Sequence, residues 1–335
     1  MALARRSFVG LGAAVALSLA TTSCRSAGQD QTRASSPRPT TGPPSPSARV
    51  TTRPPAFPGQ PDPGHLYYGA SLPADRSLTG WERSLGSTLA LHRSYFTPDH
   101  NETAQLVRQC RDDLAHHRLP HVSTKVPATW RDVADGRQDA WLTAILEPLA
   151  QEQAPVFLTI HHEPENDAGG AGMLPADFVA MQRRAIRLAD DLAPQVTIVP
   201  LLQHWSFEPL NTRGDPAAWL VPEAAVLGVD VYNAWSPTNG KEWRSFGSRV
   251  DDVIRRVGDL PIAIGEYGCR EDPLNPGLAA DWLEDAAGDA RSRNIVSMSY
   301  FNSGANSPDG SLELSPDMER AFADLLASDW VARPV

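Results

Sequence analysis

Signatures of several common enzyme classes are missing from this sequence of 335 residues. No Gly-x-Gly-x-x-Gly turn follows an apolar run, which argues against an open dinucleotide-binding sheet. The Gly-x-Ser-x-Gly elbow of α/β serine hydrolases is absent, and so is the His-Glu-x-x-His pattern of zinc peptidases. No internal sequence repeat is visible. Each missing motif removes one class of catalytic site from consideration.

Positive charge is scarce in most of the chain. Residues 1–63 hold seven Arg and two Asp, a net charge of +5, whereas the remainder holds 23 basic and 38 acidic residues, a net charge of −15. Nucleic acid is therefore not an expected partner, because phosphate binding needs a basic face. A neutral sugar carries no charge to attract, so this composition does not argue against a polysaccharide or oligosaccharide substrate.

Cysteine is equally scarce, with three residues in the chain. Cys110 and Cys269 could pair in an oxidising compartment, but sequence alone does not show whether they meet. Cys110 has apolar neighbours at helical spacing, which favours a buried thiol.

The N-terminal 24 residues are typical of an export signal rather than of a fold. Arg5 and Arg6 precede the apolar stretch Val9–Ala20, which is too short to span a bilayer as a mature helix, and the pattern resembles a twin-arginine signal. Cys24 follows a small residue and resembles a lipoprotein processing site, although Thr21 stands where an aliphatic residue is usual. We therefore expect an exported, extracellular or cell-surface protein whose one membrane contact is a lipid at Cys24. The alternative is an ordinary signal cleaved nearby.

Residues 25–63 contain ten Pro with many Ser, Thr and Arg and almost no aliphatic side chains. Such a segment cannot bury enough apolar surface to fold, so we expect a disordered linker. It would tether the domain to the membrane, or else be a tail without a role.

From residue 64 to residue 335 short apolar runs alternate with amphipathic helical patterns. Continuous apolar strands separated by helices indicate a parallel sheet covered by helices, and eight such units fit a single (β/α)8 TIM barrel. Helices are expected at 101–118, around 178–192 and at 316–328. The eight predicted strands are Leu66–Ala70, Thr88–His92, His121–Lys125, Val156–His161, Val196–Leu202, Val226–Val231, Ile262–Glu266 and Ile295–Phe301.

Two of these strands end in a carboxylate. Glu163 follows the fourth run and Glu266 ends the seventh. Since active sites of such barrels lie at the carboxyl ends of the strands, these side chains could flank a bound substrate. Glycoside hydrolysis needs this pair: one carboxylic acid protonates the leaving oxygen, and one carboxylate attacks or activates water.

At these residues the chain resembles glycoside hydrolase family 26, a β-mannanase-like family in the clan of barrel glycosidases with catalytic Glu on strands four and seven. In that family a His directly precedes the acid/base, as His162 precedes Glu163 here. The nucleophile context Ile-Gly-Glu-Tyr-Gly matches residues 264–268, and a Tyr near the end of strand six, here Tyr232, is expected to touch the nucleophile. The chain departs from the family where Pro-Glu-Asn follows Glu163 and where Asn302 ends a strand on which Trp is common.

The resemblance implies a retaining endo-β-glycanase, with β-mannan the first substrate to test. Glu163 would be the general acid/base and Glu266 the nucleophile, with no cofactor and no metal, and we expect a monomer. Glu165, Glu208 and Asp230 are not expected to catalyse, and Asp230 is interpreted as a structural hydrogen-bond partner.

Further side chains after the predicted strands could contact a sugar. Trp205, Trp235 and Trp243 could stack on pyranose rings or pack in the core. His204 and His92 could bond sugar hydroxyls or satisfy loop carbonyls. We assign His92, His162, His204, Trp205, Tyr232 and Trp235 to substrate binding.

Two other functions stay open at this stage. A non-catalytic carbohydrate-binding lipoprotein would bind oligosaccharides without turnover. A metal-dependent hydrolase would use His161 and His162, and chelators would inhibit it.

Overall fold

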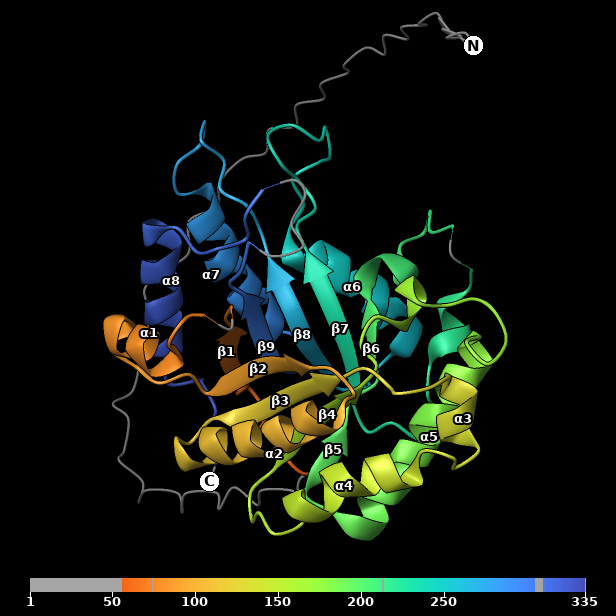
Figure 1. Ribbon diagram of the computed structural model, residues 1–335. Helices are drawn as coiled ribbons and strands as arrows, with labels where there is room; N and C mark the ends of the chain where they lie inside the picture. The colour runs from red at the N-terminus through yellow and green to blue at the C-terminus, as the bar shows by residue number, and fades with distance from the viewer. Residues whose placement is uncertain (1–55, 74, 213, 305–309, 335) are drawn as a thin grey trace, which may run out of the picture. The chain divides into compact units, whose positions relative to one another are not determined.

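The computed structural model describes residues 56–73, 75–212, 214–304 and 310–334 (Figure 1). These residues form the predicted (β/α)8 barrel. The export signal, Cys24 and residues 25–55 of the expected linker lie outside the described residues. The strands are β1 (Tyr67–Ser71), β2 (Leu91–Phe96), β3 (Leu119–Thr124), β4 (Val156–Ile160), β5 (Val196–Ile198), β6 (Leu201–Gln203), β7 (Leu227–Tyr232), β8 (Ile262–Gly268) and β9 (Ile295–Phe301).

All strand pairs are parallel, in the order β5-β4-β3-β2-β1-β9-β8-β7-β6. The two end strands are halves of the single strand predicted at Val196–Leu202, so the sheet closes into a ring through them. The interruption lies at Val199 and Pro200, because proline has no N–H to donate to a neighbouring strand. The Val199 N–H still donates to the Leu158 carbonyl (2.9 Å), and the Pro200 carbonyl accepts from the Gly228 N–H (2.7 Å).

Helices cover the outside of the barrel (Figure 1). The helix predicted at 101–118 begins at His100, where the Asp99 carboxylate accepts from the Glu102 N–H, and ends at Ala115. After β6, short 3₁₀ turns at His204–Phe207 and Pro216–Trp219 stand where a long helix would be usual. The described α-helices are α1 (Leu78–Leu85), α2 (His100–Ala115), α3 (Trp130–Ala134), α4 (Asp139–Leu149), α5 (Pro175–Leu192), α6 (Phe246–Val257), α7 (Leu278–Arg291) and α8 (Pro316–Leu326).

The second strand lies three to four residues later than predicted. The apolar run ends at His92, whereas β2 continues through Arg93 and Tyr95 to Phe96. Both Arg93 and Tyr95 line the cavity described below, so this end of the strand faces polar space rather than apolar core. A prediction based on the apolar run therefore ends this strand too early, at His92 instead of Phe96.

The bottom of the barrel is closed by an apolar layer that includes Phe57. Phe57 is 5% exposed and its ring centroid lies 6.3 Å from that of Phe157 on β4. The Thr197 hydroxyl donates to the Pro58 carbonyl (2.8 Å). Residues 56–63, which we expected in the disordered linker, thus belong to the barrel, because Phe57 packs into the apolar layer at the barrel end.

Phe57→Ala is expected to lower the free energy of unfolding by about 3–5 kcal/mol, since it removes a buried ring and leaves a cavity. Urea denaturation of the full-length protein measures the loss. Leu210→Ala is the control, because Leu210 is 92% exposed and its truncation should cost less than about 0.5 kcal/mol. A loss below about 1 kcal/mol for Phe57→Ala would show that the barrel end does not depend on this ring.

Cys110 and Cys269 are both buried free thiols. Cys110 lies on the inner face of α2, as its helical neighbours predicted, and Cys269 follows β8. In the part of the chain that the structure describes, no helix has the length and apolar character needed to cross a bilayer.

Candidate active site

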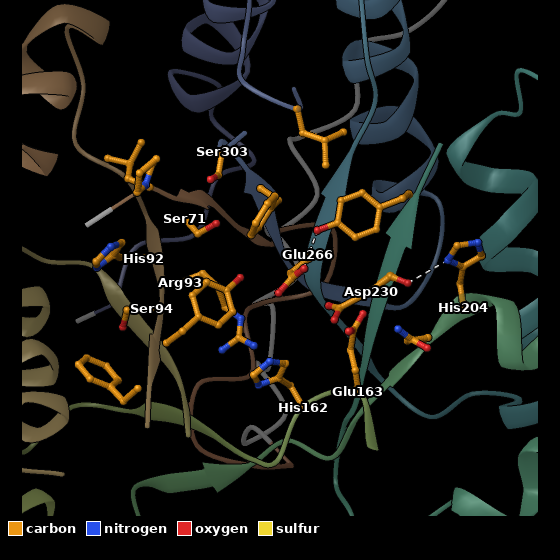
Figure 2. Close-up of a pocket in the computed structure, with 18 of the residues that line it drawn as sticks. Ser71, His92, Arg93, Ser94, His162, Glu163, His204, Asp230, Glu266 and Ser303 are labelled. Atoms are coloured by element: carbon orange, nitrogen blue, oxygen red, sulfur yellow. Dashed lines mark hydrogen bonds between the residues drawn. The ribbon is translucent and has the colours of Figure 1, made fainter. Parts of the chain in front are cut away.

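The carboxyl ends of the strands surround a cavity of about 1250 Å³ (Figure 2). Glu163, Glu266, His162 and Tyr232 all line it, so the structure brings together the central residues singled out in the sequence. They come from the segment after β4 and from β7 and β8. The site is therefore built from strands that are distant in sequence.

Glu163 is held in an unusual backbone conformation. Its φ is 48° and its ψ is 54°, the left-handed region that non-glycine residues rarely adopt, and His161 has a φ of 61°. Hydrogen bonds from the neighbouring strands hold this turn: the His161 N–H donates to the Thr124 carbonyl (2.8 Å), and the Glu163 N–H donates to the Leu201 carbonyl (3.1 Å). Such strain is characteristic of functional sites, and here it turns the Glu163 side chain into the cavity.

A bulge in β8 sets the direction of Glu266. Val229 of β7 pairs with Ile264, but the next residue, Asp230, pairs with Glu266, so Gly265 is an extra residue. A Cβ atom at Gly265 would lie 2.2 Å from the Leu201 side chain and 2.8 Å from the Asp230 carboxyl, so any other residue would force these buried side chains to move. The bulge brings Glu266 onto the cavity side of the strand.

The environment of Glu163 favours its protonated form. Burial raises the pKa of Glu163 to about 7, and the nearby charge of Glu266 adds to the rise, while a hydrogen bond from Gln203 opposes it. The Asn166 amide also donates to the Glu163 carboxyl (3.0 Å). A carboxyl group with this pKa can donate a proton near neutral pH.

Glu266 has a different environment. It is 9% exposed, and the Tyr232 hydroxyl donates to its carboxylate at 2.5 Å. Burial and the charge of Glu266 hold the pKa of Tyr232 well above its usual value, so the phenol keeps its proton. A donor at this distance suits an ionised carboxylate.

His162 forms part of the floor next to Glu163. Its Nδ1 lies 2.9 Å from the Ser123 hydroxyl, and Lys125 donates to its carbonyl (2.8 Å). Burial and the charges of Lys125 and Arg93 hold the pKa of His162 well below its usual value. The imidazole is therefore neutral and adds no second positive charge beside Glu163.

Asp230 was interpreted as a structural hydrogen-bond partner, and that interpretation is wrong. Its side chain is 1% exposed, lines the cavity, and accepts no hydrogen bond from any described residue. Burial and the charges of Glu266 and Glu163 raise the pKa of Asp230 well above its usual value. Figure 2 shows it beside both glutamates, so the site holds a third carboxyl group, shifted toward its neutral form. Its position on the inner face of β7 was not evident from the strand-end pattern.

Two predicted sugar-binding residues do not offer a free group to the central site. His204 Nδ1 lies 3.0 Å from the Asp230 carbonyl and its Nε2 lies 2.8 Å from an Arg249 nitrogen, so both ring nitrogens are engaged. Trp235 is absent from the cavity lining, and its ring packs against Trp243 with centroids 5.2 Å apart. His204 thus lines the cavity with both ring nitrogens engaged, and Trp235 lies outside the lining.

The other two, His92 and Trp205, also line the cavity. His92 lines a side of the cavity away from Glu163 and Glu266 (Figure 2), and its Nδ1 is 2.9 Å from the buried Asp113 carboxylate. Trp205 lines the cavity and is 40% exposed. Trp205 is thus an accessible aromatic surface.

The remaining carboxylates near the site are structural. Glu165 accepts from the Gln203 N–H (2.9 Å) and from the Ser206 hydroxyl (2.8 Å), and Glu208 binds Arg249 (2.6 Å). Sequence reasoning missed Gln203 and Asn166, the two amides that bond Glu163. Their only signal is position: Gln203 ends β6 and Asn166 lies three residues after Glu163.

The adjacent histidines His161 and His162 point to different partners. His161 Nε2 lies 2.8 Å from Asp167, whereas His162 bonds Ser123. Across the described ranges, no three His, Cys, Asp or Glu side chains are grouped as metal ligands.

No protein-family model matches the sequence, and no curated protein matches it either. Solved structures share its fold. They include the GH5-4 broad-specificity endoglucanase from Clostridium longisporum (12% identity over 78% of this chain and 96% of that chain, TM-score 0.58). The exo-β-1,4-mannosidase Op5Man5 from an Opitutaceae bacterium is similar, with 14% identity over 78% of this chain and 59% of that chain and a TM-score of 0.54. GH26C from a Muricauda species has 15% identity over 80% of this chain and 87% of that chain, with a TM-score of 0.52. At these identities the likeness is one of fold: the chain has the barrel found in family 26 and other glycoside hydrolases.

Proposed function

We propose that this protein is an exported, retaining glycoside hydrolase that cleaves β-linked polysaccharide. The observation that carries the proposal is the contrast between two carboxyl groups in one cavity. Glu163 has a pKa raised to about 7, and Glu266 accepts a hydrogen bond from Tyr232 at 2.5 Å. Two carboxyls whose environments differ in this way are what acid-assisted glycosidic cleavage needs.

In the first step, protonated Glu163 gives its proton to the glycosidic oxygen as the bond from that oxygen to the anomeric carbon breaks. A Glu266 oxygen forms a bond to the same carbon, giving a glycosyl ester of the enzyme. Tyr232 directs one Glu266 oxygen by its hydrogen bond. The leaving sugar departs with the proton.

In the second step, Glu163 is ionised and takes a proton from water, whose oxygen attacks the anomeric carbon. The ester bond to Glu266 breaks and the carboxylate is regenerated. His162 and Asp230 are both shifted toward their neutral forms, which reduces the charge that these two groups place beside Glu163 as it changes its protonation state.

β-Mannan is the substrate to test first, because of the family 26 motifs and because a mannosidase shares the fold. Reducing-sugar release from mannan, mixed-linkage glucan and xylan by the full-length protein tests the proposal. NMR of the first-formed anomer distinguishes retention from inversion. Binding without release of sugar from any polymer would contradict the reaction and favour a non-catalytic binding protein.

Tyr232→Phe is expected to lower kcat by roughly 10- to 100-fold, since a hydrogen bond to a charged group contributes about 1.5–3 kcal/mol. KM should change less, because the phenol contacts the carboxylate and not a remote sugar. Initial rates on the best polymer measure both constants. An unchanged kcat would mean that Tyr232 does not orient the nucleophile.

The proposal also includes the cellular location of the protein. Arg5 and Arg6 with the apolar stretch after them would direct export, and Cys24 would carry a lipid on the outer face of the cytoplasmic membrane. Cys24→Ser should release the protein from the membrane fraction, which fractionation of expressing bacteria measures.

A further inference from the structure

One wall of the cavity carries cations that have no carboxylate partner. Lys241 follows β7 and Arg270 follows β8, and both line the cavity. Among the residues that the structure describes, neither has a carboxylate oxygen within 4.0 Å of its charged nitrogens. Within the described chain Arg270 donates to the carbonyls of Gly310 (3.1 Å) and Trp235 (3.3 Å). Both charges are thus available to a ligand.

The arginines behind this wall already have a carboxylate partner. Arg249 binds the Glu208 carboxylate (2.6 Å), and Arg244 binds the same group (3.3 Å). Glu208 is therefore held by two guanidinium groups and has little attraction left for Lys241. The neighbouring His204 has a pKa lowered to about 3 by burial and by the Arg249 charge, so it is neutral.

An exposed aromatic ring lies on the same wall. Lys241 and Trp205 both line a smaller hollow of about 280 Å³ that continues from the cavity. Large exposed apolar side chains are few in the described ranges, and of these Trp205 alone lines the cavity. A ring beside an ammonium group can stack on a pyranose and bind its charged substituent together.

The catalytic floor does not cancel this positive charge. Arg93 is 1% exposed, its Nε and one Nη have no hydrogen-bond partner in the described chain, and Figure 2 shows it aimed into the cavity. Burial and the nearby carboxylate charges shift Glu163 and Asp230 toward their neutral forms. The floor therefore carries less negative charge than its three carboxyl groups would otherwise give. The wall carries Lys241 and Arg270, with the exposed Glu242 in the smaller hollow, on a domain whose net charge is −15 over residues 64–335.

We propose that Trp205, Lys241 and Arg270 form a subsite for a negatively charged sugar unit, so that the substrate is an acidic β-glycan. The anionic group would be a carboxylate or a sulfate on the pyranose, with its ring on Trp205 and its charge toward Lys241 and Arg270. This rests on the proposed glycosidase function and narrows its substrate class.

Calorimetry with the full-length Glu266→Ala protein tests the subsite without turnover. The ligands are mannohexaose and cellohexaose, each neutral, oxidised to the carboxylate at C6, or sulfated at C6. At least one anionic form should bind roughly tenfold more tightly than its neutral parent, and added salt should weaken that preference. Introducing Lys241→Met and Arg270→Met into the Glu266→Ala protein should remove the preference for anionic over neutral ligands. Arg256→Met is the matched control, because Arg256 is an exposed cation on α6 outside the cavity and has no ion pair among the described residues.

Preference for the carboxylate, for the sulfate or for both would support the proposal and identify the anion. Equal binding of neutral and anionic ligands, no binding of any of them, or a preference that Lys241→Met and Arg270→Met leave intact would overturn it. Hydrolysis by the parent enzyme is measured separately. If neutral and acidic polymers are cleaved equally, the proposed hydrolysis is supported and the proposed subsite is contradicted. If the protein binds anionic ligands more tightly but cleaves no polymer, the subsite is supported and the hydrolysis is contradicted.

Discussion

Glu266→Ala is expected to reduce kcat by at least roughly a thousandfold on any polymer that the parent cleaves. The substitution removes the oxygen that would bond to the anomeric carbon, and no described side chain can replace it. Asp230 lies beside Glu266 but is shifted toward its neutral form, which is a poor nucleophile. The loss should appear in kcat more than in KM, since the substrate contacts on the cavity wall remain.

Reducing-sugar release measures this loss, and azide provides a second measurement. A small anion can enter the space left by the Glu266 carboxylate and attack in its place, which should restore turnover and form a glycosyl azide of inverted configuration. Glu313→Ala is the matched control, because Glu313 is exposed and lies next to cavity-lining Leu312. Parental activity in Glu266→Ala would remove this residue as the nucleophile and bring the metal-dependent alternative forward.

Glu163→Gln is expected to have the second largest effect, a loss of about 10²- to 10⁴-fold on polymers. The amide cannot protonate a sugar leaving group. An aryl glycoside with an acidic phenol needs little protonation, so its first step should be nearly unaffected. The dependence of the loss on the leaving group separates a missing acid from a misfolded site.

The pH profile follows from the raised pKa of Glu163. The acid must be protonated in the free enzyme, so kcat/KM should be high below pH 7 and should fall about tenfold per pH unit above it, since the pKa is about 7. Glu163→Gln should abolish this alkaline limb, whereas Glu147→Gln, an exposed position on α4, should keep it. An identical limb in Glu163→Gln and the parent would assign the titration to another group.

The barrel and the position of its two glutamates could be predicted because the signals are local. Each strand is a short apolar run, and Glu163 and Glu266 lie directly at the ends of such runs. Prediction failed where the apolar rule stops applying. β2 extends past its apolar run because Arg93 and Tyr95 face a polar cavity, and Phe57 belongs to the barrel although prolines surround it.

The properties of the site depend on residues that only the fold brings together. Asp230 looked structural because a strand-end Asp commonly bonds nearby backbone, whereas burial in the fold and the closeness of Glu266 and Glu163 shift it toward its neutral form. The charge of the wall likewise depends on which cations lack a carboxylate partner in the described chain. The fold places Glu208 against Arg249, whereas it places backbone carbonyls against Arg270.

The amino-acid sequence by itself determined the alternation of strands and helices and the identity of the two opposed glutamates, because periodicity and strand-end position are properties of adjacent residues. The tertiary structure decided how burial raises the pKa of Glu163, where β8 bulges at Gly265, and which cations of the described chain have no carboxylate partner. These properties depend on burial and on distances between side chains far apart in the chain, and no local pattern encodes them.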